Sequence, residues 1–182
     1  MLCCHPVEIH SKGVVSLTIQ KIIIWVLVLT VAGSFLAPVQ AEMTVAPTPS
    51  SCKTYMDYRA ITNTESEQWK LIQTLEKCED GMLRDEYGFI AAALGSYFGG
   101  IGSRWLFFTE DGKIIPIVKT DAKQDRHTDS SNIYGSQNYD IIEFVIDGSH
   151  LQKEANGFIY WGNFNNCEKF EGAVVGWLQI SE

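Results

Sequence analysis

Short apolar runs separated by glycines and turn residues dominate the chain after Gly81. Runs of this length between turn residues are typical of strands, and six candidates lie at 89–94, 105–108, 114–118, 141–146, 158–161 and 173–180. The pair Asp111-Gly112, between the second and third runs, predicts a tight hairpin turn. Pro116 lacks a backbone donor, so it indicates an edge or a strand crossing at that point of the third strand.

A helical pattern precedes these runs. Thr64 and Glu67 have the spacing of a capping box, and Trp69, Ile72 and Leu75 follow on one face, which predicts a helix at about 64–80 ending at Gly81. Short strands joined by turns, with no helices between them, favour a small barrel or sandwich over an alternating α/β sheet. The expected fold is therefore mainly β, a small six-stranded barrel with one preceding helix, in a domain that covers residues 61–182.

The N-terminal region has the composition of an export signal. Lys21 is followed by the uncharged apolar run 22–32, and Val39-Gln40-Ala41 offers a cleavage site after the helix-ending Pro38. An uncleaved membrane anchor is the alternative, although the apolar stretch reaches only 15 residues even when it is extended to Leu36, against the roughly 20 that cross a bilayer. We expect residues 1–41 to be a signal peptide and the protein to be secreted, with association to the cell wall or membrane left open.

Between the signal and the domain, residues 42–60 include a segment rich in Pro, Thr and Ser, which predicts an extended linker. Three cysteines follow residue 41, namely Cys52, Cys78 and Cys167. An odd number allows at most one internal disulfide, and the sequence does not decide the pairing.

The charge of the chain restricts its partners. The formal charge is −8, and it becomes −9 without the first 41 residues, which hold two lysines and one glutamate. An acidic protein repels phosphate backbones, so we expect no nucleic-acid partner. Because ATP and nicotinamide cofactors are scarce outside the cell, we also expect no cofactor. We expect the protein to contact the membrane only through the signal segment.

Two segments hold the candidate chemistry. Asp121, Asp125, His127 and Asp129 form the densest group of titratable residues, and Glu143 lies in the otherwise apolar run 141–146. Apolar neighbours withdraw a carboxylate from water, which raises its pKa and suits it to proton transfer near neutral pH.

Three interpretations of these residues stay open. In the first, Glu143 acts as general acid and base on a glycosidic bond, with Asp121 and His127 as further catalytic residues and Asp125, Asp129 and Tyr97 in contact with the substrate. In the second, the cluster at 121–129 binds a metal, but its spacing does not match a calcium loop and one histidine is too little for zinc, so no metal is predicted. In the third, the segment is a solvated turn without chemistry.

Several pieces of the chain together resemble a group of small exported, mostly uncharacterised proteins of clostridial Firmicutes. These pieces are Ile61-Thr62-Asn63, Gln68-Trp69-Lys70-Leu71, Ala93-Leu94-Gly95-Ser96-Tyr97, Ile101-Gly102-Ser103, Asp111-Gly112-Lys113, Ile115-Pro116, residues 123–129 and residues 142–147. More distantly, the order of elements resembles the double-psi β-barrel of three-aspartate domains, expansins and murein lytic transglycosylases.

The distant resemblance implies a double-psi-like barrel and a site. Glu143 falls where the transglycosylases have a catalytic aspartate, and Asp121 falls at a second acidic position. The chain departs from that pattern in having Glu for Asp and a longer, more polar spacer. The implied function is a cell-wall enzyme that cleaves the glycan strands of peptidoglycan. The alternative is a non-catalytic module that binds peptidoglycan or another wall polysaccharide, and the oligomeric state stays open.

Overall fold

The protein is described by a computed structural model that covers residues 42–151, 153–154, 157–158 and 162–181. The expected signal segment, residues 1–41, therefore lies outside the described residues. Within them, no helix has the length and apolar composition needed to span a bilayer. The described residues belong to one compact unit.

The fold is mainly β, as the sequence predicts. Its strands are β1 (Thr44–Ser50), β2 (Thr54–Asp57), β3 (Glu76–Lys77), β4 (Leu83–Arg84), β5 (Ile90–Leu94), β6 (Arg104–Thr109), β7 (Ile114–Ala122), β8 (Glu143–Ile146), β9 (Lys153–Glu154), β10 (Gly157–Phe158) and β11 (Val174–Ser181). The helix α1 (Glu67–Ile72) and the 3₁₀ turns η1 (Tyr58–Ala60), η2 (Ser96–Phe98), η3 (Asp125–His127) and η4 (Phe164–Asn166) complete the described elements.

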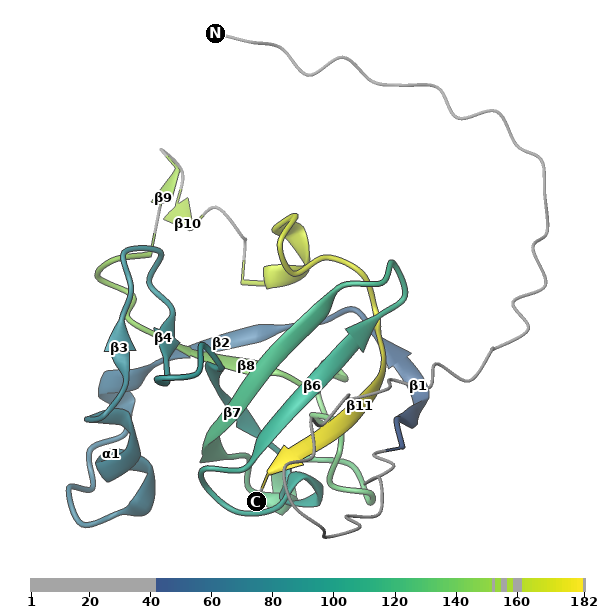
Figure 1. Ribbon diagram of the computed structural model, residues 1–182, viewed down its shortest axis with the longest axis horizontal. Coiled ribbons are helices and arrows are strands. Elements are labelled where there is room, and N and C mark those ends of the chain that lie inside the picture. The colour runs from purple at the N-terminus through teal and green to yellow at the C-terminus, as the bar shows by residue number, and fades with distance from the viewer. Residues whose placement is uncertain (1–41, 152, 155–156, 159–161, 182) are drawn as a thin grey trace, which may run out of the picture. The chain divides into compact units, whose positions relative to one another are not determined.

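Nine strands form one sheet that is not closed into a barrel (Figure 1). Its main path runs β1-β11-β6-β7-β5-β4-β3, with β8 also pairing β5 and β2 pairing β8, while β9 and β10 form a separate small hairpin. Two of the pairings are parallel, β5 with β7 and β2 with β8, and the others are antiparallel. The expected mainly β class is therefore confirmed, whereas the strands form an open nine-stranded sheet and not the expected six-stranded barrel.

The segment predicted as a linker contains two strands, so that prediction is wrong for residues 44–57. β1 pairs antiparallel with β11 at the edge of the sheet, with Thr44 opposite Trp177. An edge strand tolerates prolines because one side of it needs no donors, and this position accommodates Pro47 and Pro49. The side chains of Ala46 and Ser50 are buried, and this burial attaches the otherwise polar segment to the domain.

The helix is shorter than the predicted range of about 64–80. Ser66, not Thr64, is the N-cap, and its hydroxyl accepts from the backbone N–H of Trp69 at 3.1 Å. The helix ends at Ile72, and β3 begins four residues later. Leu75 lies beyond the helix but packs with Ile72 in the same core cluster. The apolar spacing that predicted a long helix is therefore produced by a short helix followed by a turn.

Most of the predicted strands are confirmed. The runs at 89–94 and 141–146 contain β5 and β8, and those at 105–108, 114–118 and 173–180 overlap the longer β6, β7 and β11, while 158–161 lies mostly outside the described residues. Gly112 has φ +83° in the predicted hairpin turn between β6 and β7. Pro116 lies opposite Leu106 of β6, one residue before the pairing with β5 begins at Ile117, so at that point β7 has only one neighbour.

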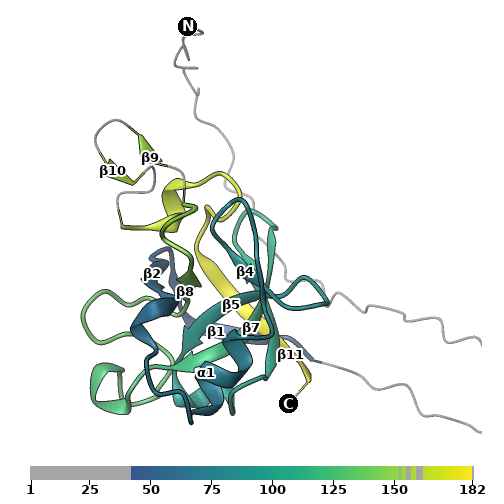
Figure 2. The ribbon, with the colours of Figure 1, turned by 90° about the vertical axis from the view of Figure 1, so that its left-hand side faces the viewer.

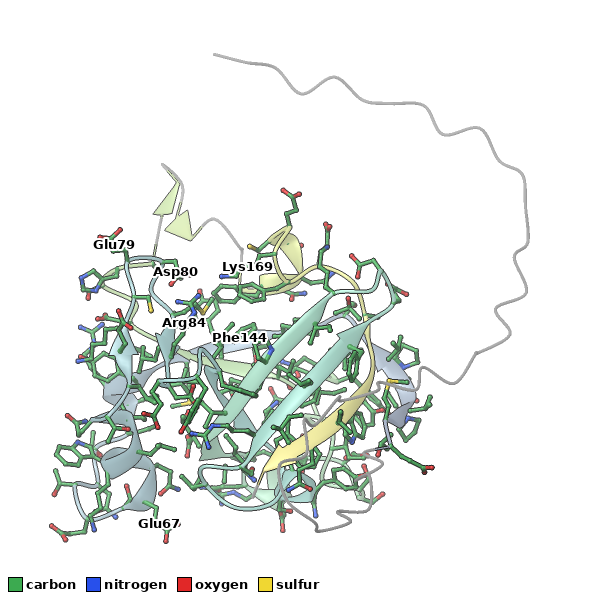
Figure 3. All side chains as sticks on the ribbon, in the orientation of Figure 1. Glu67, Glu79, Asp80, Arg84, Phe144 and Lys169 are labelled. Atoms are coloured by element: carbon green, nitrogen blue, oxygen red, sulfur yellow. The ribbon has the colours of Figure 1, made fainter. Side chains whose placement is uncertain are left out.

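Both faces of the sheet are covered around β5, which is buried along its whole length. On one face, a large cluster includes Phe98, Phe107, Phe144 and Trp177. On the other, Ile72 and Leu75 of the α1 segment pack against Ala91 of β5 and Val145 of β8, and α1 lies over this face (Figure 2). Figure 3 marks Phe144 within the fold and the surface cluster in which Asp80 pairs with Arg84 at 2.6 Å and Lys169 at 3.5 Å.

The strand directions gather particular ends of the chain at one end of the sheet. β5, β7 and β11 run in one direction, while β1, β2, β6 and β8 run in the other. The carboxyl ends of the first three and the amino ends of the other four therefore lie at the same end of the sheet; in Figure 1, β7 and β11 end, and β6 begins, at the lower end of the picture. We call this end, marked by Thr54, Ala93, Trp105, Asp121 and Glu143, the site end.

Candidate functional site

A row of four side chains crosses the site end. Thr54 of β2 pairs with Glu143 of β8, Glu143 pairs with Ala93 of β5, and Ala93 pairs with Asp121 of β7. Residues that are partners across neighbouring strands point to the same face of a sheet. The register thus places Glu143 and Asp121, which lie far apart in the sequence, on one face with a single alanine between them.

A bulge in β7 brings Asp121 into this row. Ala92 pairs with Lys119, but the next residue, Ala93, pairs with Asp121, so Thr120 is the extra residue. Without the bulge, regular pairing would place Thr120 in the row and turn Asp121 to the opposite face.

One strand, β5, separates the two carboxylates. Two strand spacings separate their Cα atoms by about 10 Å, and the methyl group of Ala93 is the only side chain that the row places between them. Both Glu143 and Asp121 are half-buried. The row therefore offers two carboxylates that are partly withdrawn from bulk water without being fully buried.

Burial raises the pKa of Glu143 above the ordinary range of a glutamate. The Lys123 ammonium opposes this shift, whereas the negative charges of Asp140 and Asp121 add to it. Burial also raises the pKa of Asp121. This rise is opposed by the Ala122 backbone N–H, which donates to Oδ1 of Asp121 at 2.8 Å, by the Gln68 side chain and by the charge of Lys119. Each group therefore retains a proton to higher pH than a solvated carboxylate, as acid/base catalysis requires.

A buried ion pair lies beside Glu143. Lys123 Nζ is 2.8 Å from Asp140 Oδ2, and the two side chains are only 6% and 5% exposed. Asp140 also accepts a hydrogen bond from the Thr54 hydroxyl. Its Oδ1 would lie 2.1 Å from a Cβ added at Gly135, so the glycine leaves space for the carboxylate. These charges are held in place by the fold and set the field around Glu143.

The structure does not bring the other predicted polar residues to the row. His127 is exposed in η3, and its described hydrogen bonds are those of its backbone. Asp125 accepts from Ser96 Oγ at 2.7 Å, and Asp129 accepts from the backbone N–H groups of Ile133 and Tyr134, which shapes its own loop. In the part of the chain that the structure describes, no three His, Cys, Asp or Glu side chains are placed to hold a metal ion.

Tyr97 lies at the site end but apart from the carboxylate row. It belongs to η2, directly after β5, and its ring is 45% exposed at the rim of a hollow of about 430 Å³. Lys119 fixes this turn, because its buried Nζ donates to the carbonyl oxygens of Gly95 at 2.9 Å and Gly99 at 2.6 Å.

Sequence reasoning missed the buried partners of the site. Thr54 was assigned to a linker, and Lys123 was read only as part of a polar segment. Asp140 carried a usable signal, since it directly precedes the apolar pair Ile141-Ile142 and is buried as they are. Lys119 carried a similar one, because it continues the apolar run of β7.

Taken together, these features define an open, mainly β domain with a pair of half-buried carboxylates at one end. No protein-family model matches the chain, and no curated protein or solved structure is significantly similar to it. The resemblances to small exported clostridial proteins and, more distantly, to double-psi barrels therefore stay predictions, and the function has to be argued from the site itself.

Proposed function

We propose that this protein is an exported, cell-wall-associated enzyme that cleaves glycosidic bonds in the glycan strands of peptidoglycan, in the manner of a lytic transglycosylase. Glu143 is the general acid and base, and Asp121 is the second acidic group. The observation that carries the proposal is the row in which these two carboxylates share one face, with Ala93 between them and with both pKa values raised by burial.

Protonated Glu143 supplies the first step. It donates its proton to the oxygen of the glycosidic bond, and the bond between that oxygen and the sugar carbon breaks with both electrons going to the oxygen. Positive charge that develops on the sugar ring is stabilised by the carboxylate of Asp121 across the row. Glu143, now ionised, takes the proton of the attacking hydroxyl group, which comes either from water or from the same sugar, and returns to its starting state.

The ion pair of Lys123 and Asp140 serves this cycle through its field. Lys123 favours the ionised form of Glu143, while Asp140 and Asp121 favour the protonated form. A group that must first give and then take a proton works best when neither form is strongly preferred. The buried position of the pair keeps these opposing effects constant from one turnover to the next.

Export and the double-psi-like arrangement rest on other observations. Export is supported by the basic residue, apolar run and candidate cleavage site within residues 1–41. A double-psi-like arrangement is supported by the two parallel pairings, β5 with β7 and β2 with β8, within an otherwise antiparallel sheet. Neither depends on the geometry of the carboxylate row.

A non-catalytic module that binds wall polysaccharide is the second candidate. The hollow beside Tyr97 favours it, because an exposed ring such as that of Tyr97 can stack on a sugar without any need for acid/base groups. Both candidates predict attachment to the wall, and only the first predicts release of fragments.

Incubation with purified murein separates the two candidates. Wild type, Glu143→Gln and the matched control Glu86→Gln, which changes an exposed glutamate away from the row, are compared for release of soluble fragments. The enzyme proposal predicts release by wild type and by Glu86→Gln, and loss of at least 100-fold in rate for Glu143→Gln, in keeping with the usual contribution of about 10²–10⁴ from general acid/base catalysis. Sedimentation with murein but no release by the wild type would instead support the binding module.

A further inference from the structure

The hollow at the site end has its own set of side chains. It is lined by Glu42, Thr44, Tyr97, Trp105, Trp177 and Gln179, together with Leu178. These residues come from β1 and the segment just before it, from η2, from the start of β6 and from the end of β11. The lining thus combines aromatic rings with a carboxylate, a hydroxyl and an amide, and none of these groups belongs to the row of Glu143 and Asp121.

One buried polar atom of this lining has no hydrogen-bond partner in the part of the chain that the structure describes. The indole Nε1 of Trp177 is buried, and among the described residues nothing accepts a hydrogen bond from it. The neighbouring Trp105 differs, because its Nε1 donates to the Phe98 carbonyl and to Ser103 Oγ, each at 3.2 Å. Buried donors are almost always satisfied in folded proteins, so an unsatisfied one indicates a missing acceptor.

A lone water is a poor candidate for that acceptor. The rings of Tyr97, Phe98 and Phe107 surround the indole of Trp177, with centroids 5.7, 5.2 and 6.3 Å away. A buried water needs two to four polar partners, and aromatic rings provide none of the usual ones. An acceptor atom that is part of a larger ligand does not need polar partners of its own, because the ligand's other contacts with the protein hold it in place.

We propose that this hollow is a binding site for a neutral sugar ring that bears a hydrogen-bond acceptor, such as the amide oxygen of an N-acetylated sugar. Tyr97 packs edge-on against Trp177, with ring centroids 5.7 Å apart, and its exposed ring turns on binding so that it packs against the apolar face of the sugar while the Trp177 indole donates to the acceptor. Glu42 and Gln179 bind the hydroxyl groups at the rim. The carboxylate of Glu42 disfavours anionic sugars at the same place.

The hollow and the carboxylate row lie at the same end of the sheet but on opposite faces. η2 links the hollow to the carboxylate row, because Lys119 holds this turn through Gly95 and Gly99, and Lys119 lies two residues before Asp121 on β7. Both places are at the site end of the sheet. Glu143 alternates with Val145 and so lies on the face that α1 covers, whereas Trp105 and Trp177 belong to the cluster on the other face, which makes the hollow a separate site. The inference rests on the proposed function only for the identity of the ligand as a glycan.

The test is a titration of the ¹⁵N-labelled protein with a tetrasaccharide of β-1,4-linked N-acetylglucosamine. The indole N–H signal of Trp177, assigned by its loss in Trp177→Phe, is expected to move downfield and to saturate. Tyr97→Ala is expected to weaken binding about tenfold, which corresponds to 1.4 kcal/mol. Tyr87→Ala, which removes an exposed tyrosine that does not line the hollow, is expected to leave the affinity unchanged.

The outcomes separate this inference from the proposed function. Saturable movement of the Trp177 signal without any release of murein fragments supports the hollow and overturns the catalytic proposal. Release of fragments that is insensitive to Tyr97→Ala, with the Trp177 signal unmoved by the tetrasaccharide, overturns the hollow and leaves catalysis in place. The inference is also overturned if the tetrasaccharide perturbs other signals but not that of Trp177. Because Trp177 belongs to the core, Tyr97→Ala keeps the test valid if Trp177→Phe fails to fold.

Discussion

Replacing Lys123 by methionine is expected to destabilise the protein severely while leaving its apolar packing nearly intact. Methionine keeps most of the length of the aliphatic chain and removes the charge, so the main change is at Asp140. That carboxylate loses a partner at 2.8 Å, retains the Thr54 hydroxyl and stays only 5% exposed to water.

The magnitude follows from that burial. Removing one member of a buried ion pair costs about 3–5 kcal/mol, because the other charge is left without compensation. A domain of this size has a total stability of about 5–15 kcal/mol, so the variant is expected to be close to its unfolding limit. The double variant Lys123→Met/Asp140→Asn removes both charges and is expected to recover most of the loss, since the side-chain amide that replaces the carboxylate can still accept from the Thr54 hydroxyl.

Urea unfolding of wild type, both single variants and the double variant measures this effect as a double-mutant cycle. A coupling free energy of at least about 2 kcal/mol is expected, above the range of about 0.2–1 kcal/mol that exposed pairs give. A coupling below about 0.5 kcal/mol would refute the reasoning, because it would place the pair within the range of solvated ion pairs.

Three further outcomes are expected. Glu143→Gln stabilises the protein at pH 7. Folding raises the pKa of the Glu143 carboxyl, so this group contributes its full stability only below its unfolded pKa of about 4.3 and loses that contribution as the pH rises through the folded pKa. Thermal melts at pH 4 and pH 7 should therefore show a smaller gain in stability at pH 4. Gly95→Ala lowers stability by about 1–3 kcal/mol, since the added Cβ would lie 1.9 Å from the Asn132 carbonyl oxygen; Gly100→Ala, whose Cβ meets nothing within 4 Å, is the matched control in the same urea assay. In the murein assay, a folded Lys123→Met sample should show the limb of the pH–rate profile that reports Glu143 displaced to higher pH, because Lys123 lowers the pKa of Glu143.

The sequence predicted the central strands but not the edge of the sheet. The runs that became β5, β6, β7 and β11 are apolar enough to be buried on at least one face, and turn residues such as Gly112 bound them. β1 has few apolar residues and two prolines, which is the composition of a linker as well as of an edge strand. What distinguishes the two is the pairing with β11, and a partner at the far end of the domain sequence leaves no local signal.

The candidate site was predicted by residue type more than by position. Glu143 was identified because apolar neighbours predicted its burial, and burial is indeed the main cause of its raised pKa. Its relation to Asp121 depends on the registers of two strand pairs and on the bulge at Thr120, none of which can be read from spacing along the chain. Proximity in sequence suggested that His127 belongs to the same site, but His127 is exposed in η3 and is not part of the row.

The central claim is that Glu143 and Asp121 share one partly desolvated site, and carboxyl titration by ¹³C NMR tests it most directly. The structure predicts that Glu143 titrates above the ordinary range of a glutamate, and that Asp121→Asn lowers its pKa because a neighbouring negative charge is removed. Asp125→Asn, which changes an exposed carboxylate outside the row, is the control and should leave the titration of Glu143 unchanged. An ordinary pKa for Glu143 that does not respond to Asp121→Asn would contradict the account.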